Sequence, residues 1–308
     1  FQNYIAVSGS PEFFLYYGIK KTKKIDVTLT FDSDMVKDEY YNFEFSYAIP
    51  DRLIITRVNR IIYNKDGKVL IDLRKPPYSE YQLNQSSNPV DKFLSDTKIF
   101  QFHDTGMDSP LRMLSNIENA DYLQSNGANL AAYLFWMKNE APDYYNRIVS
   151  YIKQIMPQFG DFYLEPNAAG YLTLKWKDDT ANDYIQLSQQ ISDGSLRFMA
   201  LATLLLQPEY RMPGVIILDE PELGLHPAAI NQFAEMVKEA SQYAQIIIAT
   251  QSPQLADEFE PSQIIIAERD EEKAATTLGH LDENRLKEWL DEYSISELWN
   301  KNVIGGRP

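Results

Sequence analysis

The sequence predicts an α/β fold with a mainly parallel core sheet, flanking helices and a separate antiparallel β lobe. Two short apolar runs, at 215–218 and 245–250, are typical of parallel strands buried on both faces. The stretch between them contains a helical segment, 227–243, so the three parts form one βαβ unit. In the first hundred residues, segments that alternate between apolar and polar residues, such as 25–31 and 43–47, predict the antiparallel lobe.

The first apolar strand ends in two adjacent carboxylates, Asp219 and Glu220. Carboxylates are costly to bury without a partner, so their delivery at a strand end indicates a cation or a polarised water. Open α/β sheets bind ligands at the carboxyl ends of their strands. Asp219 therefore fits a magnesium carboxylate, and Glu220 fits the base that orients an attacking water. The alternative is a solvated acidic turn, since acidic residues favour turns.

A short stretch of small and polar residues precedes an apolar helical run, 196–206, whose only charge is Arg197. The unpaired backbone N–H groups and positive dipole at such a helix start bind phosphate. Serine and aspartate are also preferred N-caps, so a plain cap is the competing interpretation. The position of the stretch ahead of the acidic strand favours phosphate binding. Its residues are Ser192, Asp193, Gly194 and Ser195.

Gln251 follows the second apolar strand, and the βαβ unit places it at the tip of the strand next to Asp219. A polar side chain at that point can contact a terminal phosphate or the attacking water. The alternative is a polar residue that only caps the strand end.

Five segments together resemble one family. The chain is similar to stand-alone bacterial AAA-family ATPases of ABC type, which are related to RecF and SMC proteins. The resemblance implies a P-loop NTPase fold of ABC-ATPase type, in which two heads sandwich two ATP molecules, and it covers nearly all of the chain after about residue 100. The segments are FQFHDTGMDSP, ISDGSLRFMALATLLLQP, VIILDEPELGLHPAAI, IIIATQSPQLAD and YSISELWNKNVIGGRP.

The resemblance also implies residue roles. The segment with Ser192 and Gly194 resembles the ABC signature, which contacts the ATP held by the opposite head of a homodimer or higher oligomer. Asp219 then holds Mg²⁺, Glu220 is the base, and 223–227 is similar to the D-loop at the dimer seam.

Two departures from the family pattern stand out. Most ABC-type heads carry a histidine where this chain has Gln251, so its expected role is hydrogen bonding, because an amide takes no proton. No G-x-x-x-x-G-K-[ST] string occurs in the 308 residues, although a P-loop needs its lysine on the phosphates. Because the chain opens on Phe1, we expect a leading segment with the P-loop to precede it; a degenerate ATPase is the competing interpretation.

The segment FQFHDTG lies where the first lobe passes to a helical part, the place of the Q-loop in ABC-type heads. Gln101, His103 and Asp104 are candidates for sensing the magnesium site, against a structural role for His103. We expect an N-terminal β-rich lobe, a helical signature-side subdomain, a core with the signature and acidic strand, and a C-terminal tail. Their bounds are 1–106, 107–180, 181–266 and 267–308.

The cysteine content, the apolar runs and the net charge of the sequence exclude several classes of protein. The chain has no cysteine, which excludes a disulfide scaffold, and no apolar run or leader typical of membrane or secreted proteins, so we expect a cytoplasmic protein that enters no membrane. The net charge of −15 argues against a general nucleic-acid coat. Two basic stretches could still contact DNA or be solvated sheet faces. They contain Lys20, Lys21, Lys23 and Lys24, and Arg52, Arg57, Arg60, Lys65 and Lys68.

The family resemblance implies a head whose ATP-dependent dimerisation and hydrolysis drive or regulate a separately encoded effector, such as a Toprim-type nuclease. The process would be phage defence or DNA maintenance. The sequence contains no long heptad run, so we expect no coiled-coil arm of the SMC kind. Two alternatives stay open: a RecF-like DNA-binding repair ATPase, and a scaffold that binds nucleotide without hydrolysis.

Overall fold

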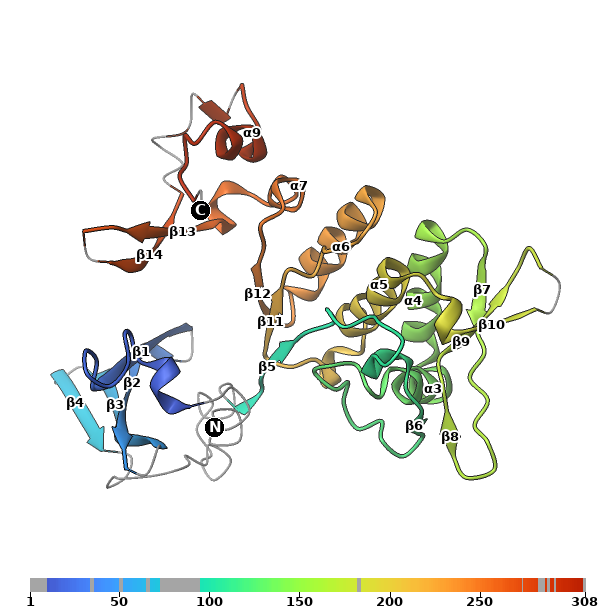
Figure 1. Ribbon diagram of the computed structural model, residues 1–308, viewed down its shortest axis with the longest axis horizontal. Helices are drawn as coiled ribbons and strands as arrows, with labels where there is room; N and C mark the ends of the chain where they lie inside the picture. The colour runs from blue at the N-terminus through green and yellow to red at the C-terminus, as the bar shows by residue number, and fades with distance from the viewer. Residues whose placement is uncertain are drawn as a thin grey trace. The chain divides into compact units, whose positions relative to one another are not determined.

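The structure, a computed structural model, describes residues 10–33, 36–49, 52–64, 67–72, 95–181, 184–272, 274–281, 286, 289–290 and 292–306. The chain divides into two compact units, Phe1–Ser95 and Asp96–Pro308. Each unit has its own sheets (Figure 1). Each also has its own buried side chains. The finer division at residues 106, 180 and 266 stays a prediction.

An antiparallel meander forms the first unit. A short 3-10 helix, η1 (Pro11–Phe14), precedes four strands that pair in the order of the sequence. The meander confirms the antiparallel strands predicted from the period-two pattern. The turn expected at Lys65 and Asp66 and the loop expected at 76–88 lie outside the described residues. The strands are β1 (Lys24–Ser33), β2 (Val36–Ala48), β3 (Arg52–Asn64) and β4 (Gly67–Asp72).

Aromatic and branched side chains gather on one face of the meander, as alternation along antiparallel strands predicts. The rings of Tyr41 and Phe43 stack at 6.4 Å between centroids, and Tyr41 is fully buried. Leu53 packs with Leu15, which ends the turn of η1. The opposite face carries Glu44, whose register partner is Arg57.

Three parallel strands form the core sheet of the second unit, in the order β12-β11-β5. They are β5 (Thr97–Phe100), β11 (Val215–Asp219) and β12 (Gln245–Ala249). Pairing of Asp219 with Ala249 confirms the predicted βαβ neighbours. β5 corrects the expectation that the strands of the first hundred residues are all antiparallel. Four residues are too short a run to show whether a strand is parallel from its pattern.

Helices cover this sheet (Figure 1). α6 (Pro227–Ala240) joins β11 to β12, and α5 (Asp193–Leu205) packs against both α6 and α4 (Pro142–Ile155). α3 (Leu130–Glu140) precedes α4, with Ala141 between them, close to the two helices expected at 128–138 and 144–156. Every residue of α5 from Leu196 onward is buried, which explains its almost unbroken apolar sequence.

A small β region lies between α4 and α5. β7 (Phe159–Phe162) pairs with β9 (Lys175–Asp178), which also pairs with β10 (Ile185–Leu187). The hairpin expected at 163–177 is confirmed: the backbone N–H of Asn167 donates to Tyr171 O at 2.8 Å. Two short strands, β6 (Ser115–Asn116) and β8 (Tyr171–Leu172), pair beside it. The second unit also contains three 3-10 turns: η3 (Pro110–Arg112) before α3, η4 (Ser188–Gln190) before α5 and η5 (Glu209–Arg211) after α5.

The C-terminal part contains a hairpin that sequence reasoning missed. After α7 (Pro253–Ala256) and the turn η6 (Pro261–Gln263), β13 (Ile265–Asp270) pairs with β14 (Ala275–His280). The expected helical tail at 284–299 is represented by α9 (Ile295–Asn300), which packs on α7, while part of that range lies outside the described residues. Among the described helices, none has the length and apolar character needed to cross a bilayer.

Candidate functional site

The three parallel strands bring their carboxyl ends to one edge of the core sheet. Gln101 follows β5, Glu220 follows β11, and Thr250 with Gln251 follows β12. Asp219 is the last residue of β11, and its side chain is 56% exposed although the strand before it is largely buried. The carboxyl edge, as we call these strand ends, is where open α/β sheets bind ligands.

Glu220 and Gln251 are hydrogen-bonded partners at this edge. Gln251 Nε2 donates to Glu220 Oε1 at 2.7 Å, and the backbone N–H of Glu220 donates to Ala249 O at 2.7 Å. Glu220 has φ +37°, which is uncommon for a residue with a side chain and is held only where neighbours over-determine the backbone. The contact leaves the second carboxylate oxygen of Glu220 and the amide oxygen of Gln251 able to accept hydrogen bonds.

His103 faces the other carboxylate. Its Nε2 lies 3.9 Å from Asp219 Oδ2, which is beyond hydrogen-bond distance but within ion-pair range. Asp104 instead accepts a hydrogen bond from the backbone N–H of Gly106 at 3.2 Å, and the side chain of Gln101 is exposed. Of the three residues of the FQFHDTG segment considered as sensors, His103 is the one placed beside Asp219.

Among the described residues, no group of three or more histidines and carboxylates is arranged to hold a metal ion. Mg²⁺ in proteins keeps several waters and takes one or two protein carboxylates together with substrate phosphates. Asp219 is the exposed carboxylate at the edge that suits this role.

Ser192 is the N-cap of α5. Its Oγ accepts from the backbone N–H of Ser195 at 3.2 Å and donates to Ser195 Oγ at 2.8 Å. The structure thus confirms the cap, and phosphate binding at the same place stays a prediction. Asp193 forms an ion pair with Arg112 at 2.9 Å.

Gly194 lies against the segment that resembles the D-loop. A Cβ built on Gly194 would approach Gly224 O at 2.3 Å, closer than real Cβ contacts allow. Gly224 itself has φ +76°, a conformation that favours glycine. A glycine is therefore required at 194 by packing within this chain, in addition to any role toward phosphate.

Arg197, the single charge of the apolar run, is 5% exposed. Its Nε donates to Phe102 O and its Nη2 to His103 O, both at 3.0 Å. Burial lowers the pKa of the Arg197 guanidinium, while the charges of Asp193 and Glu222 oppose that shift, and arginine remains protonated. α5 is thereby tied to the loop that carries His103.

A second buried charge, Glu222, lies behind the edge. Glu222 is 8% exposed, and its Oε1 accepts from the hydroxyl of Thr250. Thr250 Oγ1 in turn accepts from the backbone N–H of Ser252 at 2.9 Å. Both neighbours of Gln251 in the sequence, Thr250 and Ser252, are therefore fixed by hydrogen bonds. Glu222 Oε2 is buried without a hydrogen-bond partner among the described residues.

Sequence reasoning missed Arg112, Glu222 and Thr250. A signal existed for Arg197, since a lone charge in an apolar helix is costly to bury without acceptors. For Glu222, the third acid of DEPE, the only sequence signal is its position after the paired carboxylates.

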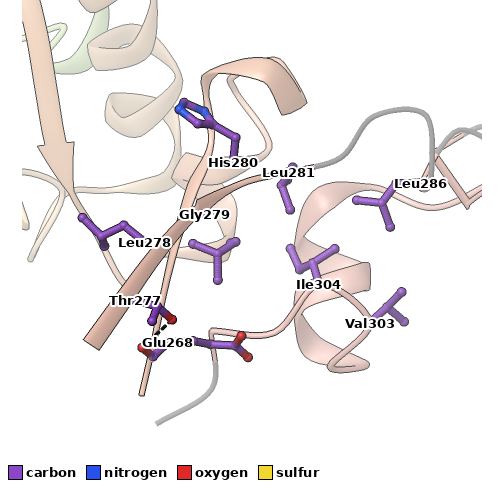
Figure 2. Close-up of a pocket in the computed structure, with 10 residues that line it drawn as sticks. Glu268, Thr277, Leu278, Gly279, His280, Leu281, Leu286, Val303 and Ile304 are labelled. Atoms are coloured by element: carbon purple, nitrogen blue, oxygen red, sulfur yellow. Dashed lines mark hydrogen bonds between the residues drawn. The ribbon is translucent and has the colours of Figure 1, made fainter. Parts of the chain in front are cut away.

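The space at the carboxyl edge is small. A hollow lined by His103, Arg197, Asp219 and Glu220 holds about 10 Å³, room for about one water. A larger pocket of about 240 Å³ lies elsewhere, in the C-terminal part (Figure 2). Its walls combine apolar side chains with the polar side chains of Glu268, Thr277 and His280, and it shares no residue with the carboxyl edge.

One family model matches most of the chain. The model of a family described as "AAA domain, putative AbiEii toxin, Type IV TA system" matches residues 17–257. No curated protein matches the chain.

Solved structures similar to this chain include heads of SMC proteins. An SMC head bound to the C-terminal winged-helix domain of ScpA is 12% identical, with a TM-score of 0.47, over 81% of this chain and 76% of the other. The SMC head domain of Thermotoga maritima is 13% identical, with a TM-score of 0.37, over 81% and 78%. An SMC head of Pyrococcus furiosus with an extended coiled coil is 12% identical, with a TM-score of 0.41, over 82% and 80%.

Proposed function

The chain belongs to this family of AAA domains, and from that premise we propose that it is an ATP-hydrolysing head of ABC type that dimerises around ATP. The observation that carries the proposal is the hydrogen bond between Gln251 and Glu220 beside Asp219, at the carboxyl edge. No G-x-x-x-x-G-K-[ST] string occurs among the 308 residues, so the proposal assigns the P-loop lysine to no residue of this sequence.

In the proposed reaction, Glu220 accepts a proton from the water that attacks the terminal phosphate of ATP. Gln251 holds Glu220 Oε1 and keeps the carboxylate turned toward the edge. Because the donor is neutral, the carboxylate keeps its charge and can still act as an acceptor. Asp219 would hold Mg²⁺, which supplies charge neutralisation for the phosphates when bound.

The second half of the site would come from another copy of the chain. The hollow at the carboxyl edge has room for about one water, so ATP needs further surfaces to enclose it. The first turn of α5 supports this role, with Ser192 exposed and Ser195 half-buried at a capped, positively polarised helix start. We therefore propose that Ser192 and Gly194 contact the ATP of the partner head.

The dimer would drive or regulate a separately encoded effector. The family's description names a putative toxin of a type IV toxin–antitoxin system, which fits a role in cellular defence. The product of a neighbouring gene is the first candidate partner.

Contacts in the first unit weigh against a DNA-binding function as the main one. Lys24 and Arg57 both reach Glu44, at 3.1 Å and 3.7 Å, so two charges of the basic stretches are paired within the sheet. Arg60 lies over the ring of Tyr41 on the other face, so the arginines of β3 do not form one continuous basic surface. Phosphate binding takes unpaired cations that share a surface.

Replacement of Glu220 by glutamine tests the proposal in the full-length gene product. We expect hydrolysis to fall about 10²- to 10⁴-fold, the usual value of a general base or water-positioning group, while ATP binding persists. The variant should accumulate as an ATP-bound dimer, measured by light scattering with and without ATP.

The matched control is Glu235→Gln, since Glu235 is an exposed acid that pairs with Lys238 three residues along α6. We expect parental turnover from it. Parental turnover in Glu220→Gln would remove Glu220 from the mechanism, and a parent that binds ATP without turnover would support the scaffold alternative.

A further inference from the structure

One buried side chain, Arg112, joins the loop after β5 to the loop before α5. It lies at the end of η3 and is 5% exposed. On one side, its Nε donates to Thr105 O at 2.9 Å and to Gly106 O at 3.1 Å. This loop also carries His103, which faces Asp219.

The other end of the same guanidinium reaches the start of α5. Nη1 donates to Ser188 O, and Nη2 donates to Ile191 O at 3.1 Å and to Asp193 Oδ1 at 2.9 Å. Arginine carries five N–H donors in a rigid planar fork, so these acceptors occupy its donors and fix the two loops against each other.

The partners of Arg112 differ in exposure. The carbonyl groups lie in buried surroundings, whereas the side chain of Asp193 is 67% exposed at the first turn of α5. In the proposed function, the phosphates of ATP bind at that turn. An unpaired carboxylate at the turn would repel these phosphates. An arginine held 2.9 Å away compensates this charge.

We infer that Arg112 is a positioning residue that neutralises Asp193 and so makes an aspartate-containing signature able to accept the phosphates of ATP. The inference rests on the proposed function. In this inference Asp193 does not contact the nucleotide directly, and its charge is balanced by the ion pair with Arg112. The bonds of Arg112 also couple this turn to the loop of His103, so the two surfaces that one head contributes to two different composite sites keep a fixed relative geometry.

Charge compensation tests the role. In Arg112→Gln, the amide still donates to part of the carbonyl set, but Asp193 loses its cation. We expect the ATP concentration that gives half-maximal dimerisation, and the KM for ATP, to rise about tenfold or more, because an uncompensated charge acts directly on the phosphate. Adding Asp193→Asn should return both values to within about threefold of the parent, since it removes the repelling charge.

A purely structural role would give a different result, because Asp193→Asn leaves the buried carbonyls as they are. Failure of the double variant to recover would therefore overturn the inference. If Arg112→Gln does not fold, Asp193→Asn alone decides: the inference expects KM for ATP to fall or to stay within about threefold, since the turn becomes more positive. A rise of about tenfold or more would make Asp193 a direct ligand and would also overturn it.

Arg211→Gln is the matched control. Arg211 Nη1 also donates to backbone carbonyls, Ala120 O at 3.3 Å and Asp121 O, and its guanidinium lies 4.1 Å from the ring of Trp136. It should keep parental values, and equal losses in both arginine variants would contradict the inference. A parent that never dimerises with ATP would instead contradict the proposed function itself.

Discussion

The carboxyl edge and the first turn of α5 both place polar groups at the terminus of a buried element. Different contacts fix these polar groups in the two regions. At the edge, Glu220 and Gln251 contact each other through their side chains, and Asp219 is largely exposed. At the first turn of α5, Gly194 lies against the backbone of Gly224, so a new side-chain atom there has no space.

This difference separates two kinds of sensitivity. Exposed side chains at strand ends can be exchanged without repacking, so changes at the carboxyl edge should affect rate more than stability. A glycine against backbone has no flexible neighbour to move, so changes at the first turn should affect stability as well as binding. The predictions below test this contrast, beginning with the largest effect.

Gln251→Ala should slow hydrolysis with little change in unfolding. Loss of the hydrogen bond to Glu220 should cost about 1 to 3 kcal/mol of transition-state stabilisation, or roughly ten- to a hundredfold in rate. Steady-state turnover and urea unfolding of the full-length protein measure the two effects separately.

Gln251→His extends this test. The imidazole can donate one hydrogen bond, so part of the activity should remain, and a pH dependence near neutrality should appear that the parent lacks. Profiles between about pH 5.5 and 8 check this, around the ordinary pKa of histidine. Parental activity and identical profiles in both variants would mean that Gln251 only caps its strand.

Gly194→Ala should lower the free energy of unfolding by about 1 to 3 kcal/mol, because its Cβ would meet Gly224 O. The sign is informative, since alanine in a helix is ordinarily more favourable than glycine by about 1 kcal/mol. Chemical denaturation measures the change. Gly279→Ala serves as control, because nothing lies within 4 Å of a Cβ at that position. If Gly194→Ala instead raised the free energy of unfolding, the proposed difference between the two regions in their effect on stability would be wrong.

Ser192 allows the cap and the phosphate contact to be separated. Ser192→Ala should cost about 1 kcal/mol of stability through the lost N-cap, as should Ser294→Ala at the start of α9. Ser192→Asp should keep the cap and recover that stability, yet it should weaken ATP-dependent dimerisation by bringing a negative charge to the phosphate. Dimerisation equal to the parent in Ser192→Asp would leave Ser192 as a helix cap alone.

Much of the core unit could be predicted from local sequence. Short apolar runs bounded by turn residues predict β11 and β12, and the helix between them makes their parallel pairing the simplest connection. The positions of Asp219, Glu220 and Gln251 at strand ends follow directly. β5 and the β13–β14 hairpin were missed, because a four-residue strand and an exposed hairpin carry little periodicity.

The sequence by itself determined which residues end the buried strands and begin α5, because strand ends and helix caps depend on neighbours a few residues away. Tertiary structure alone decided the contacts between these elements: Arg112 with Asp193, 81 residues apart, and Thr250 with Glu222, 28 residues apart. Most acceptors of Arg112 and Arg197 are backbone carbonyl groups, which every residue possesses and which therefore leave no mark in a sequence. Only the fold brings these carbonyl groups within reach of a guanidinium.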